Sequence, residues 1–318
     1  MEDDELPARS GKTIPVILDT DIGGDIDDTW ALAFMLRCPE LDPKLVVADT
    51  DNTTYRAKVA AKMLEAAGRT DIPVGIGVHL SDKEGGQAPW VEGYDLEAYP
   101  GIVYQDGVEA LIDTIMNSPK PVTLICTGPV PNIAAALESQ PKIAEGAKFV
   151  GMQGCIRKSP LEYGGRGGVV AEYNVAASPK ACQKAFTAPW DIVITPLDTC
   201  GFVRLEGERY RKVRDCNDPL VQALMENYRI WLRKWPYARI EEFETRSSIL
   251  FDTVTIYLAF SEDLLVIENL GIRVTDDGRT AIDNSAKTIR CATEWKDLSA
   301  FEDLLTQRLI GKQGQHST

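Results

Sequence analysis

An acidic turn near the N-terminus is the part of this chain best suited to chemistry. Residues 19–28 read Asp-Thr-Asp-Ile-Gly-Gly-Asp-Ile-Asp-Asp, which places five carboxylates directly after the apolar run at residues 14–18. Carboxylates held this close raise one another's pKa and repel, unless a cation or bound hydroxyl groups compensate their charge. Ligand sets made only of oxygen favour Ca²⁺ or Mg²⁺ over zinc. The turn therefore predicts a binding site for a hard divalent cation.

The residues alone leave two alternative interpretations of the acidic turn. It could be a solvated loop that caps a helix, since Asp is favoured in the first helical turn. It could also belong to a phosphatase of the haloacid dehalogenase type, which begins with Asp-x-Asp after its first strand and uses the first Asp, here Asp19, as nucleophile. Against the phosphatase, the second Asp, Asp21, is not followed by the Gly-Thr pair that is usual there.

Short apolar runs alternate with helical runs along the first two thirds of the chain. The predicted strands cover residues 14–18, 45–48, 122–125, 148–152 and 192–195, and the predicted helices cover residues 28–37, 54–67, 107–116, 130–137 and 179–186. This alternation predicts a single α/β domain with a mostly parallel, open sheet and helices on both faces. Because the carboxyl ends of parallel strands meet at one crevice, the acidic turn and the polar residues after the other strands are expected to converge there.

The remaining segments have different patterns. After Pro196 the sequence becomes more helical, and helices are predicted at residues 218–233 and 247–260. Residues 81–101, rich in Gly, Pro and aromatic residues, are predicted to form a long surface loop.

Composition narrows the class of protein. The net charge of −14 argues against nucleic acid or an anionic membrane as a partner, and it suits a protein that attracts cations. The seven cysteines include no Cys-x-x-Cys pair, so neither a disulfide framework nor a zinc site is predicted, and a reducing cytoplasm is expected. No signal peptide or transmembrane span is recognised. One domain over residues 14–310 is expected, between a flexible N-terminus at 1–13 and a flexible tail at 311–318.

The order of the motifs resembles the inosine-uridine-preferring nucleoside hydrolases, and the resemblance covers residues 14–260. The shared motifs are Asp19-Thr20-Asp21-Ile22-Gly23 followed, two residues later than usual, by Asp27-Asp28; Asn52 after the second strand; Thr127-Gly128-Pro129-Val130-Pro131-Asn132-Ile133-Ala134; Ala171-Glu172-Tyr173-Asn174; and Phe251-Asp252 at the start of a helix. The resemblance implies that family's fold, a Rossmann-like core in one domain. It also implies hydrolysis of the N-glycosidic bond of a ribonucleoside or modified riboside, giving free base and ribose.

The resemblance assigns a role to each matched residue. The Ca²⁺ ligands would be Asp21, Asp28, the backbone carbonyl of Thr127 and Asp252, and Asp21 would also take a proton from the attacking water. The groups that hydrogen-bond the ribose hydroxyls would be Asp27, Asn52, Glu172 and Asn174, with Met152 packed at the sugar. Members of this family are usually homodimers or homotetramers.

This chain departs from the family pattern around the leaving base and the 5′ end of the ribose. Phe251 stands where many members carry the His that precedes the metal-binding Asp, which argues against a standard inosine enzyme. Arg166 lies where an Asn region is usual; it would either meet a 5′ phosphate or carboxylate or be an ordinary surface residue.

Three further questions are left open by the residues. Four aromatic residues form either a stacking face for the base or the core or surface of an amphipathic helix: Tyr228, Trp231, Trp235 and Tyr237. Asp25 is a competitor for the place at the sugar, where Asp27 is preferred. A non-catalytic riboside-binding protein of the same fold is an alternative to the enzyme.

Overall fold

The computed structural model describes residues 13–161, 168–234 and 240–311. Within these residues, ten strands form one sheet in the order β4-β3-β2-β1-β5-β6-β7-β10-β8-β9. The strands are β1 (Ile14–Thr20), β2 (Leu41–Ala48), β3 (Val74–Ile76), β4 (Val103–Tyr104), β5 (Val122–Cys126), β6 (Ala147–Gly151), β7 (Ile192–Ile194), β8 (Leu265–Val274), β9 (Thr280–Ile282) and β10 (Thr288–Trp295). The pairs are parallel from β4 to β10, and only β8 and β9 run antiparallel to their neighbours.

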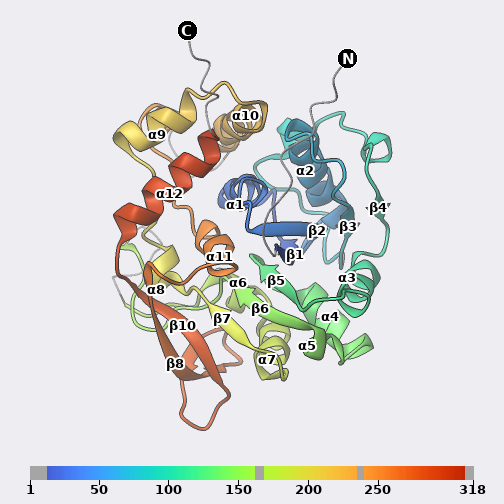
Figure 1. The fold of residues 1–318 in the computed structure, drawn as a ribbon, viewed down its shortest axis with the longest axis vertical. Helices are drawn as coiled ribbons and strands as arrows, with labels where there is room; N and C mark the ends of the chain where they lie inside the picture. The colour runs from blue at the N-terminus through green and yellow to red at the C-terminus, as the bar shows by residue number, and fades with distance from the viewer. Residues whose placement is uncertain (1–12, 162–167, 235–239, 312–318) are drawn as a thin grey trace.

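Helices cover both faces of the sheet (Figure 1). One core lies under α1 (Asp27–Leu36), α2 (Thr53–Ala66), α9 (Gly207–Arg214), α10 (Pro219–Lys234), α11 (Thr253–Leu258) and α12 (Leu298–Ile310). The other core lies under α3 (Gly107–Met116), α4 (Pro131–Ser139), α5 (Ile143–Gly146) and α7 (Pro179–Thr187). Strand β1 contributes side chains to both cores, since Val16 and Leu18 belong to the first and Ile17 to the second. The prediction of an open, mostly parallel sheet between two helical layers is confirmed.

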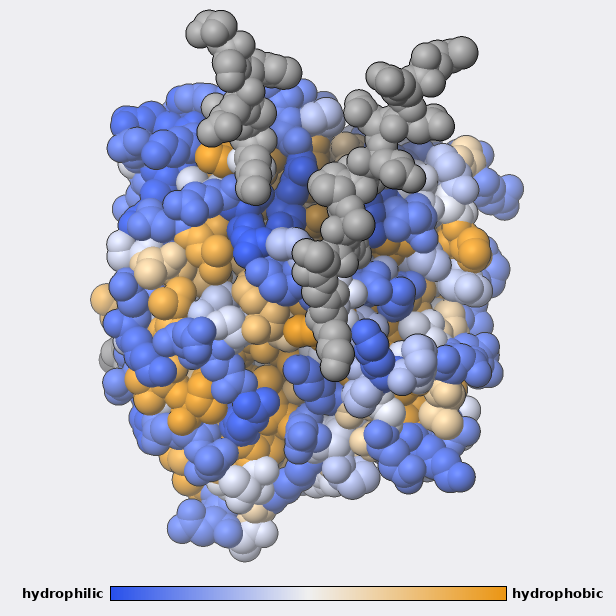
Figure 2. Space-filling view, viewed as in Figure 1, coloured by the Kyte–Doolittle hydropathy of each residue, from blue (hydrophilic) through white to orange (hydrophobic). Residues whose placement is uncertain are grey.

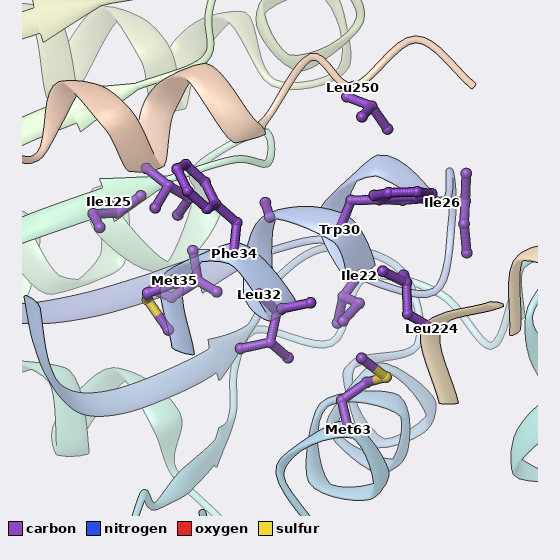
Figure 3. Packing of buried hydrophobic residues seen from close by; sticks show 14 of the residues in the cluster. Ile22, Ile26, Trp30, Leu32, Phe34, Met35, Met63, Ile125, Leu224 and Leu250 are labelled. Atoms are coloured by element: carbon purple, nitrogen blue, oxygen red, sulfur yellow. The ribbon is translucent and has the colours of Figure 1, made fainter. Parts of the chain in front are cut away.

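Helix α1 lies in the middle of the first core. Its residues from Asp27 to Met35 are all buried, so the helix is apolar on nearly every side, as expected for a helix with no face toward water. Figure 3 shows Trp30 and Phe34 on this helix with Leu250 on one side and Met63 of α2 on the other. The outer surface in Figure 2 is mainly hydrophilic, with scattered hydrophobic side chains. None of the helices in the described part of the chain combines the length and the apolar character needed to cross a membrane.

The strand ends that carry the polar motifs are level with one another. Asp19 of β1 is paired with Val47 of β2 and with Cys126 of β5, and Cys126 is paired with Gly151 of β6. The chain therefore leaves four neighbouring strands at one edge of the sheet, where the residues that follow them can meet.

Some predicted elements differ from the structure. The segment after Pro196 contains three strands, β8 to β10, that were not predicted, because β8 is half exposed along most of its length and shows no regular apolar alternation. The helix predicted at residues 247–260 is only α11. The short strands β3 and β4 were also not predicted, and α6 (Tyr173–Ala177) and α8 (Leu197–Cys200) are short helices in the connections.

The segment at residues 81–101 is not a simple surface loop. It contains the 3₁₀ turns η1 (Ala88–Val91) and η2 (Leu96–Ala98), and it buries Trp90 and Tyr99. Gln87 is fully buried in it and joins three other parts of the molecule: its Oε1 accepts from Thr29 (2.9 Å) and Asn227 (2.6 Å), and its Nε2 donates to the Asp25 carbonyl (2.7 Å).

Candidate active site

A cavity of about 300 Å³ opens at the carboxyl ends of β1, β2, β5 and β6. Nine of the candidate site residues named from the sequence line this cavity: Asp21, Asp27, Asp28, Thr127, Met152, Glu172, Asn174, Phe251 and Asp252. They come from segments far apart in the chain, and the strand ends bring them together. The volume is at the lower end of the range usual for pockets that bind small molecules.

Three carboxylates in the cavity form a tight group. Asp27 and Asp28 at the start of α1 and Asp252 at the start of α11 are all buried, and each offers an oxygen within 4.8 Å of the others. Burial raises the pKa of all three well above its usual range, and the negative charges of neighbouring carboxylates raise it further. This carboxylate triad is therefore costly for the fold unless positive charge compensates it.

Hydroxyl groups hold one member of the triad in place. Oδ1 of Asp28 accepts a hydrogen bond from the Thr20 hydroxyl at 2.5 Å and another from the Thr127 hydroxyl at 2.8 Å. Both donors lie at strand ends, Thr20 in β1 and Thr127 directly after β5. The position of this carboxylate is thus tied to the sheet edge.

Asp21 lines the same cavity but is not a member of the triad. It is 7 % exposed, and burial raises its pKa, while the charge of Arg56 and an interaction with Asp28 lower it. The small exposed fraction lets its carboxylate reach the cavity. A carboxylate with a raised pKa next to a substrate cavity is suited to accept a proton.

The opposite wall is a hydrogen-bonded unit built around Glu172 and Asn174. Glu172 caps α6: its oxygens accept from the backbone N–H groups of Asn174 (2.6 Å), Gly154 (2.8 Å) and Val175 (3.2 Å). Burial raises the pKa of Glu172 to about 7. Nδ2 of Asn174 donates to the carbonyl oxygens of Thr127 (2.8 Å) and Met152 (2.9 Å), which joins this wall to the ends of β5 and β6.

Two predicted substrate-binding residues do not line the cavity. Asn52 caps α2, where its side chain accepts a hydrogen bond from the Tyr55 backbone N–H at 3.0 Å. Trp231 is 4 % exposed and stacks on Tyr228, whose ring meets Trp30 edge to face. These two aromatic rings therefore belong to the packed side of α10. Arg166, Trp235 and Tyr237 lie outside the residues that the structure describes.

The lining also contains charged residues to which the sequence patterns gave no role. Asp51 follows β2, Arg56 lies on α2, and Lys83 and Glu84 belong to the segment at residues 81–101. Asp25 lines the cavity as well, although only Asp27 is a member of the triad. The polar residues 49–52 after the second strand indicated that this turn belongs to the site. Residue type alone did not show that Asp51, and not Asn52, lines the cavity.

Two glycines bring the segment at residues 81–101 against the acidic turn. A Cβ on Gly85 would lie 1.9 Å from the carbonyl oxygen of Gly23, and Gly23 itself has a φ of +102°. The Tyr55 hydroxyl donates to the same Gly23 carbonyl at 2.9 Å. A side chain at Gly85 would not fit between the two segments, so residues 83–86 lie directly against the acidic turn and form part of the cavity wall.

The donor set of the triad fits a hard divalent cation. Its carboxylates are buried, close together and of like charge, and Ca²⁺ takes six to eight oxygen ligands in a loose geometry. Among the described residues, no histidine lines the cavity. His79 is exposed and forms a hydrogen bond with Asp82, and His316 lies outside the described residues.

Fold and cavity together define an α/β protein whose site lies at the carboxyl ends of a parallel sheet and suits a hard cation. The family model described as inosine-uridine preferring nucleoside hydrolase matches residues 16–303, and the chain belongs to this family. The family's dependence on a metal agrees with the cluster of aspartates.

Individual relatives cover nearly the whole chain. A probable uridine nucleosidase 2 of Arabidopsis thaliana is 27 % identical over 298 residues, 89 % of either chain. The pyrimidine-specific ribonucleoside hydrolase RihA of Citrobacter koseri is 27 % identical over 323 residues, 93 % of this chain and 98 % of its own.

Solved structures show the same fold. The plant nucleoside hydrolase PpNRh1 matches with a TM-score of 0.76 at 23 % identity, over 94 % of this chain and 99 % of its own. A purine-preferring ribonucleoside hydrolase from Gardnerella vaginalis matches with a TM-score of 0.74 at 21 % identity, over 93 % of this chain and 98 % of its own. These comparisons support neither the phosphatase nor the non-catalytic binding protein.

Proposed function

We propose that the protein hydrolyses the N-glycosidic bond of a ribonucleoside and releases the free base and ribose. The observation that carries this proposal is the placement of Asp21 beside the carboxylate triad, in one cavity at the sheet edge. Water attacks the anomeric carbon, the bond from this carbon to the base nitrogen breaks, and its electron pair leaves with the base. Asp21 accepts the proton that the attacking water loses.

Other residues of the cavity hold the sugar. Asp27, Glu172 and Asn174 offer polar groups to the ribose hydroxyls, and Met152 packs against the sugar. Glu172 and Asn174 are fixed by their own hydrogen bonds to backbone groups, so the sugar meets a wall that needs no rearrangement. Such preorganisation favours the strained, oxocarbenium-like state of the sugar.

We propose Ca²⁺ as the cofactor, held by Asp21, Asp28, Asp252 and the Thr127 carbonyl, with Asp27 beside them. When bound, the ion would neutralise the carboxylates and lower the pKa of a water. The Asn174 side chain donates to the Thr127 carbonyl and fixes its direction, as outer hydrogen bonds commonly do for metal ligands.

We propose a pyrimidine ribonucleoside as the first substrate to test. The relatives from Arabidopsis thaliana and Citrobacter koseri are named a uridine nucleosidase and a pyrimidine-specific hydrolase, which supports this choice. Phe251 in the lining gives an apolar surface in place of an acid, which argues against a standard inosine enzyme.

Two features of the setting are also proposals. All seven cysteines are free and six of them are buried, which supports a reducing compartment such as the cytoplasm. A homodimer or homotetramer is proposed because members of the family usually have one of these oligomeric states.

Release of ribose from a panel of purine, pyrimidine and 5′-substituted ribosides tests the proposed function. We expect turnover of at least one pyrimidine riboside in the presence of Ca²⁺ and none after chelation. Absence of ribose release from every riboside with Ca²⁺ present would contradict the proposal.

A further inference from the structure

Asp51 and Asn52 are adjacent in the chain but have different surroundings. Asp51 lines the cavity, whereas Asn52 caps α2 through its bond to the Tyr55 backbone N–H. The cause is the backbone: Thr50 and Asp51 both have left-handed conformations, with φ values of 63° and 52°. Such conformations are uncommon for residues other than glycine, and they persist only where the surrounding structure holds them.

Several contacts hold this turn and the Asp51 side chain. The Asp51 carbonyl accepts from the Leu80 N–H at 3.0 Å, and Oδ1 of Asp51 accepts from the Ser81 hydroxyl at 2.9 Å. Oδ2 has a longer contact of 3.5 Å with Nη2 of Arg56. Each carboxylate oxygen thus has one such contact, and since it can accept two hydrogen bonds, the carboxylate retains capacity to accept one from a molecule in the cavity.

Arg56 gives Asp51 a fixed, positively charged neighbour. It is 4 % exposed, and it donates from Nε to the Thr50 carbonyl at 2.8 Å and from Nη1 to the Ile22 carbonyl at 3.1 Å. The guanidinium therefore connects the turn after β2 to the acidic turn after β1. Its charge offsets that of Asp51, so an additional carboxylate can be kept beside Asp21 and the triad.

We propose that Asp51 is a specificity-determining residue that accepts a hydrogen bond from a hydroxyl group of the sugar, and that Arg56 positions it. The inference rests on the proposed function, because it assumes that a riboside occupies the cavity. It assigns to Asp51 the hydroxyl contact that the resemblance assigns to Asn52. A carboxylate acceptor selects substrates that carry the hydroxyl donor, and loss of a hydrogen bond to a charged group costs about 10- to 100-fold in kcat/KM.

The test removes the two partners of this hydrogen bond separately and together. The wild type and the variant Asp51→Gly are compared on a riboside and its 2′-deoxy, 3′-deoxy and 5′-deoxy analogues. Glycine tolerates the left-handed backbone at this position and removes only the side chain. The preference for the intact riboside is its kcat/KM divided by the kcat/KM of a deoxy analogue. For one of the three analogues, we expect this ratio to be about 10- to 100-fold larger in the wild type than in Asp51→Gly.

Two further variants separate a contact with substrate from support of the fold. Asp51→Asn keeps the shape and an acceptor oxygen, so it is expected to restore part of the preference. Asp106→Ala is the matched control: Asp106 does not line the cavity, and its Oδ1 caps α3 by accepting from the Glu109 N–H at 2.9 Å. It is expected to lower the melting temperature and to leave the preference for the intact riboside unchanged.

The outcomes distinguish this inference from the proposed function. If the wild type hydrolyses ribosides but all three preferences are the same in Asp51→Gly, the role of Asp51 is wrong and the proposed function stands. A change of the preference in Asn52→Ala instead of Asp51→Gly would also overturn it. If the wild type hydrolyses no riboside, the proposed function and this inference both fail.

Discussion

The Thr127 hydroxyl donates a hydrogen bond of 2.8 Å to Oδ1 of Asp28, across 99 residues of chain. Thr127 follows β5 and Asp28 opens α1, so this bond fixes a carboxylate of the triad relative to the sheet edge. The backbone carbonyl of the same residue accepts a hydrogen bond from the Asn174 side chain on the opposite wall. Thr127 thus connects the two walls of the site.

Replacement of Thr127 by valine removes this hydroxyl and keeps the shape of the side chain. Because outer partners of metal ligands commonly contribute 10- to 100-fold to metal affinity, we expect Thr127→Val to bind Ca²⁺ about 10- to 100-fold more weakly. Isothermal titration of the metal-free protein with Ca²⁺ measures this change.

Thr123, on strand β5 and four residues before Thr127, provides the matched control. It is fully buried in β5, and its hydroxyl has no hydrogen-bond partner, so Thr123→Val removes a hydroxyl that contributes nothing to the site. We expect unchanged Ca²⁺ affinity and equal or greater stability. Equal Ca²⁺ affinities in the two valine variants would contradict the role given to Thr127.

Replacement of Asp21 by alanine is expected to abolish turnover and leave the fold intact. The group that accepts the proton from water is then missing, and we expect kcat to fall by about 10³-fold or more. Ribose release measures the rate, and circular dichroism verifies the fold. Asp113→Asn, on the exposed side of α3, should retain the full rate. Normal activity of Asp21→Ala would exclude Asp21 as the base.

The buried pair Asp19 and Asp49 makes the stability of the protein depend on pH. Burial raises the pKa of Asp19 to about 7, although a hydrogen bond from Asn132 opposes the shift, and burial and the charge of Asp19 raise the pKa of Asp49 well above its usual range. The folded state therefore binds more protons than the unfolded state between about pH 4 and pH 7. The two carboxyl groups favour the folded state fully at a pH below the pKa that they have in the unfolded chain. This contribution to the free energy of unfolding is lost as the pH rises through the range.

Replacement of Asp49 by asparagine removes one charge and keeps the acceptor for the Val130 backbone N–H, a bond of 3.0 Å. We expect Asp49→Asn to melt at a higher temperature than the wild type at pH 8 and at a similar temperature at pH 4. Melting curves in the presence of a chelator measure the difference. A wild-type melting temperature that rises from pH 5 to pH 7 under these conditions would contradict the pKa directions.

Phe251 is expected to make the rate sensitive to the leaving group. Protonation of a leaving group contributes about 10²- to 10⁴-fold, and no histidine lines the cavity among the described residues. We therefore expect p-nitrophenyl riboside, whose leaving group needs no proton, to react at least about 10²-fold faster than uridine.

The variant Phe251→His tests this role of Phe251. It should accelerate uridine hydrolysis and so lower the ratio of the hydrolysis rate of p-nitrophenyl riboside to that of uridine. Phe251→Leu keeps an apolar side chain and should leave this rate ratio unchanged. Competition between the two substrates in one reaction measures the ratio directly. The same ratio in the histidine and leucine variants would show that this position does not influence the leaving group.

The parallel centre of the sheet could be predicted because its strand and helical runs are local patterns, and the nine lining residues could be named because the order of the motifs resembles the nucleoside hydrolase family. Strand runs, helical runs and motif order are visible along the chain, and parallel strands bring their carboxyl ends together. The place of Asp51 could not be predicted in this way, since the turn before it needs a left-handed conformation at Thr50, which a β-branched residue rarely adopts. Trp231 was equally ambiguous, because helical periodicity does not show what packs against a face.

Lys83 and Glu84 were missed for a third reason. Their segment is joined to the acidic turn and to α1 through Gln87, which is fully buried and hydrogen-bonds to Thr29 and to the Asp25 carbonyl. Contacts of this kind join residues about 60 positions apart, and no local periodicity records them.

The close approach of Gly85 to Gly23 has a consequence for engineering. Because no Cβ fits at Gly85, the acidic turn and residues 83–86 cannot be redesigned one at a time: a change in the path of either backbone collides with the other. A laboratory that wants a new substrate range on this scaffold would have to graft both segments together. We expect libraries that place other residues at Gly85 alone to lose the packing of the two segments against each other.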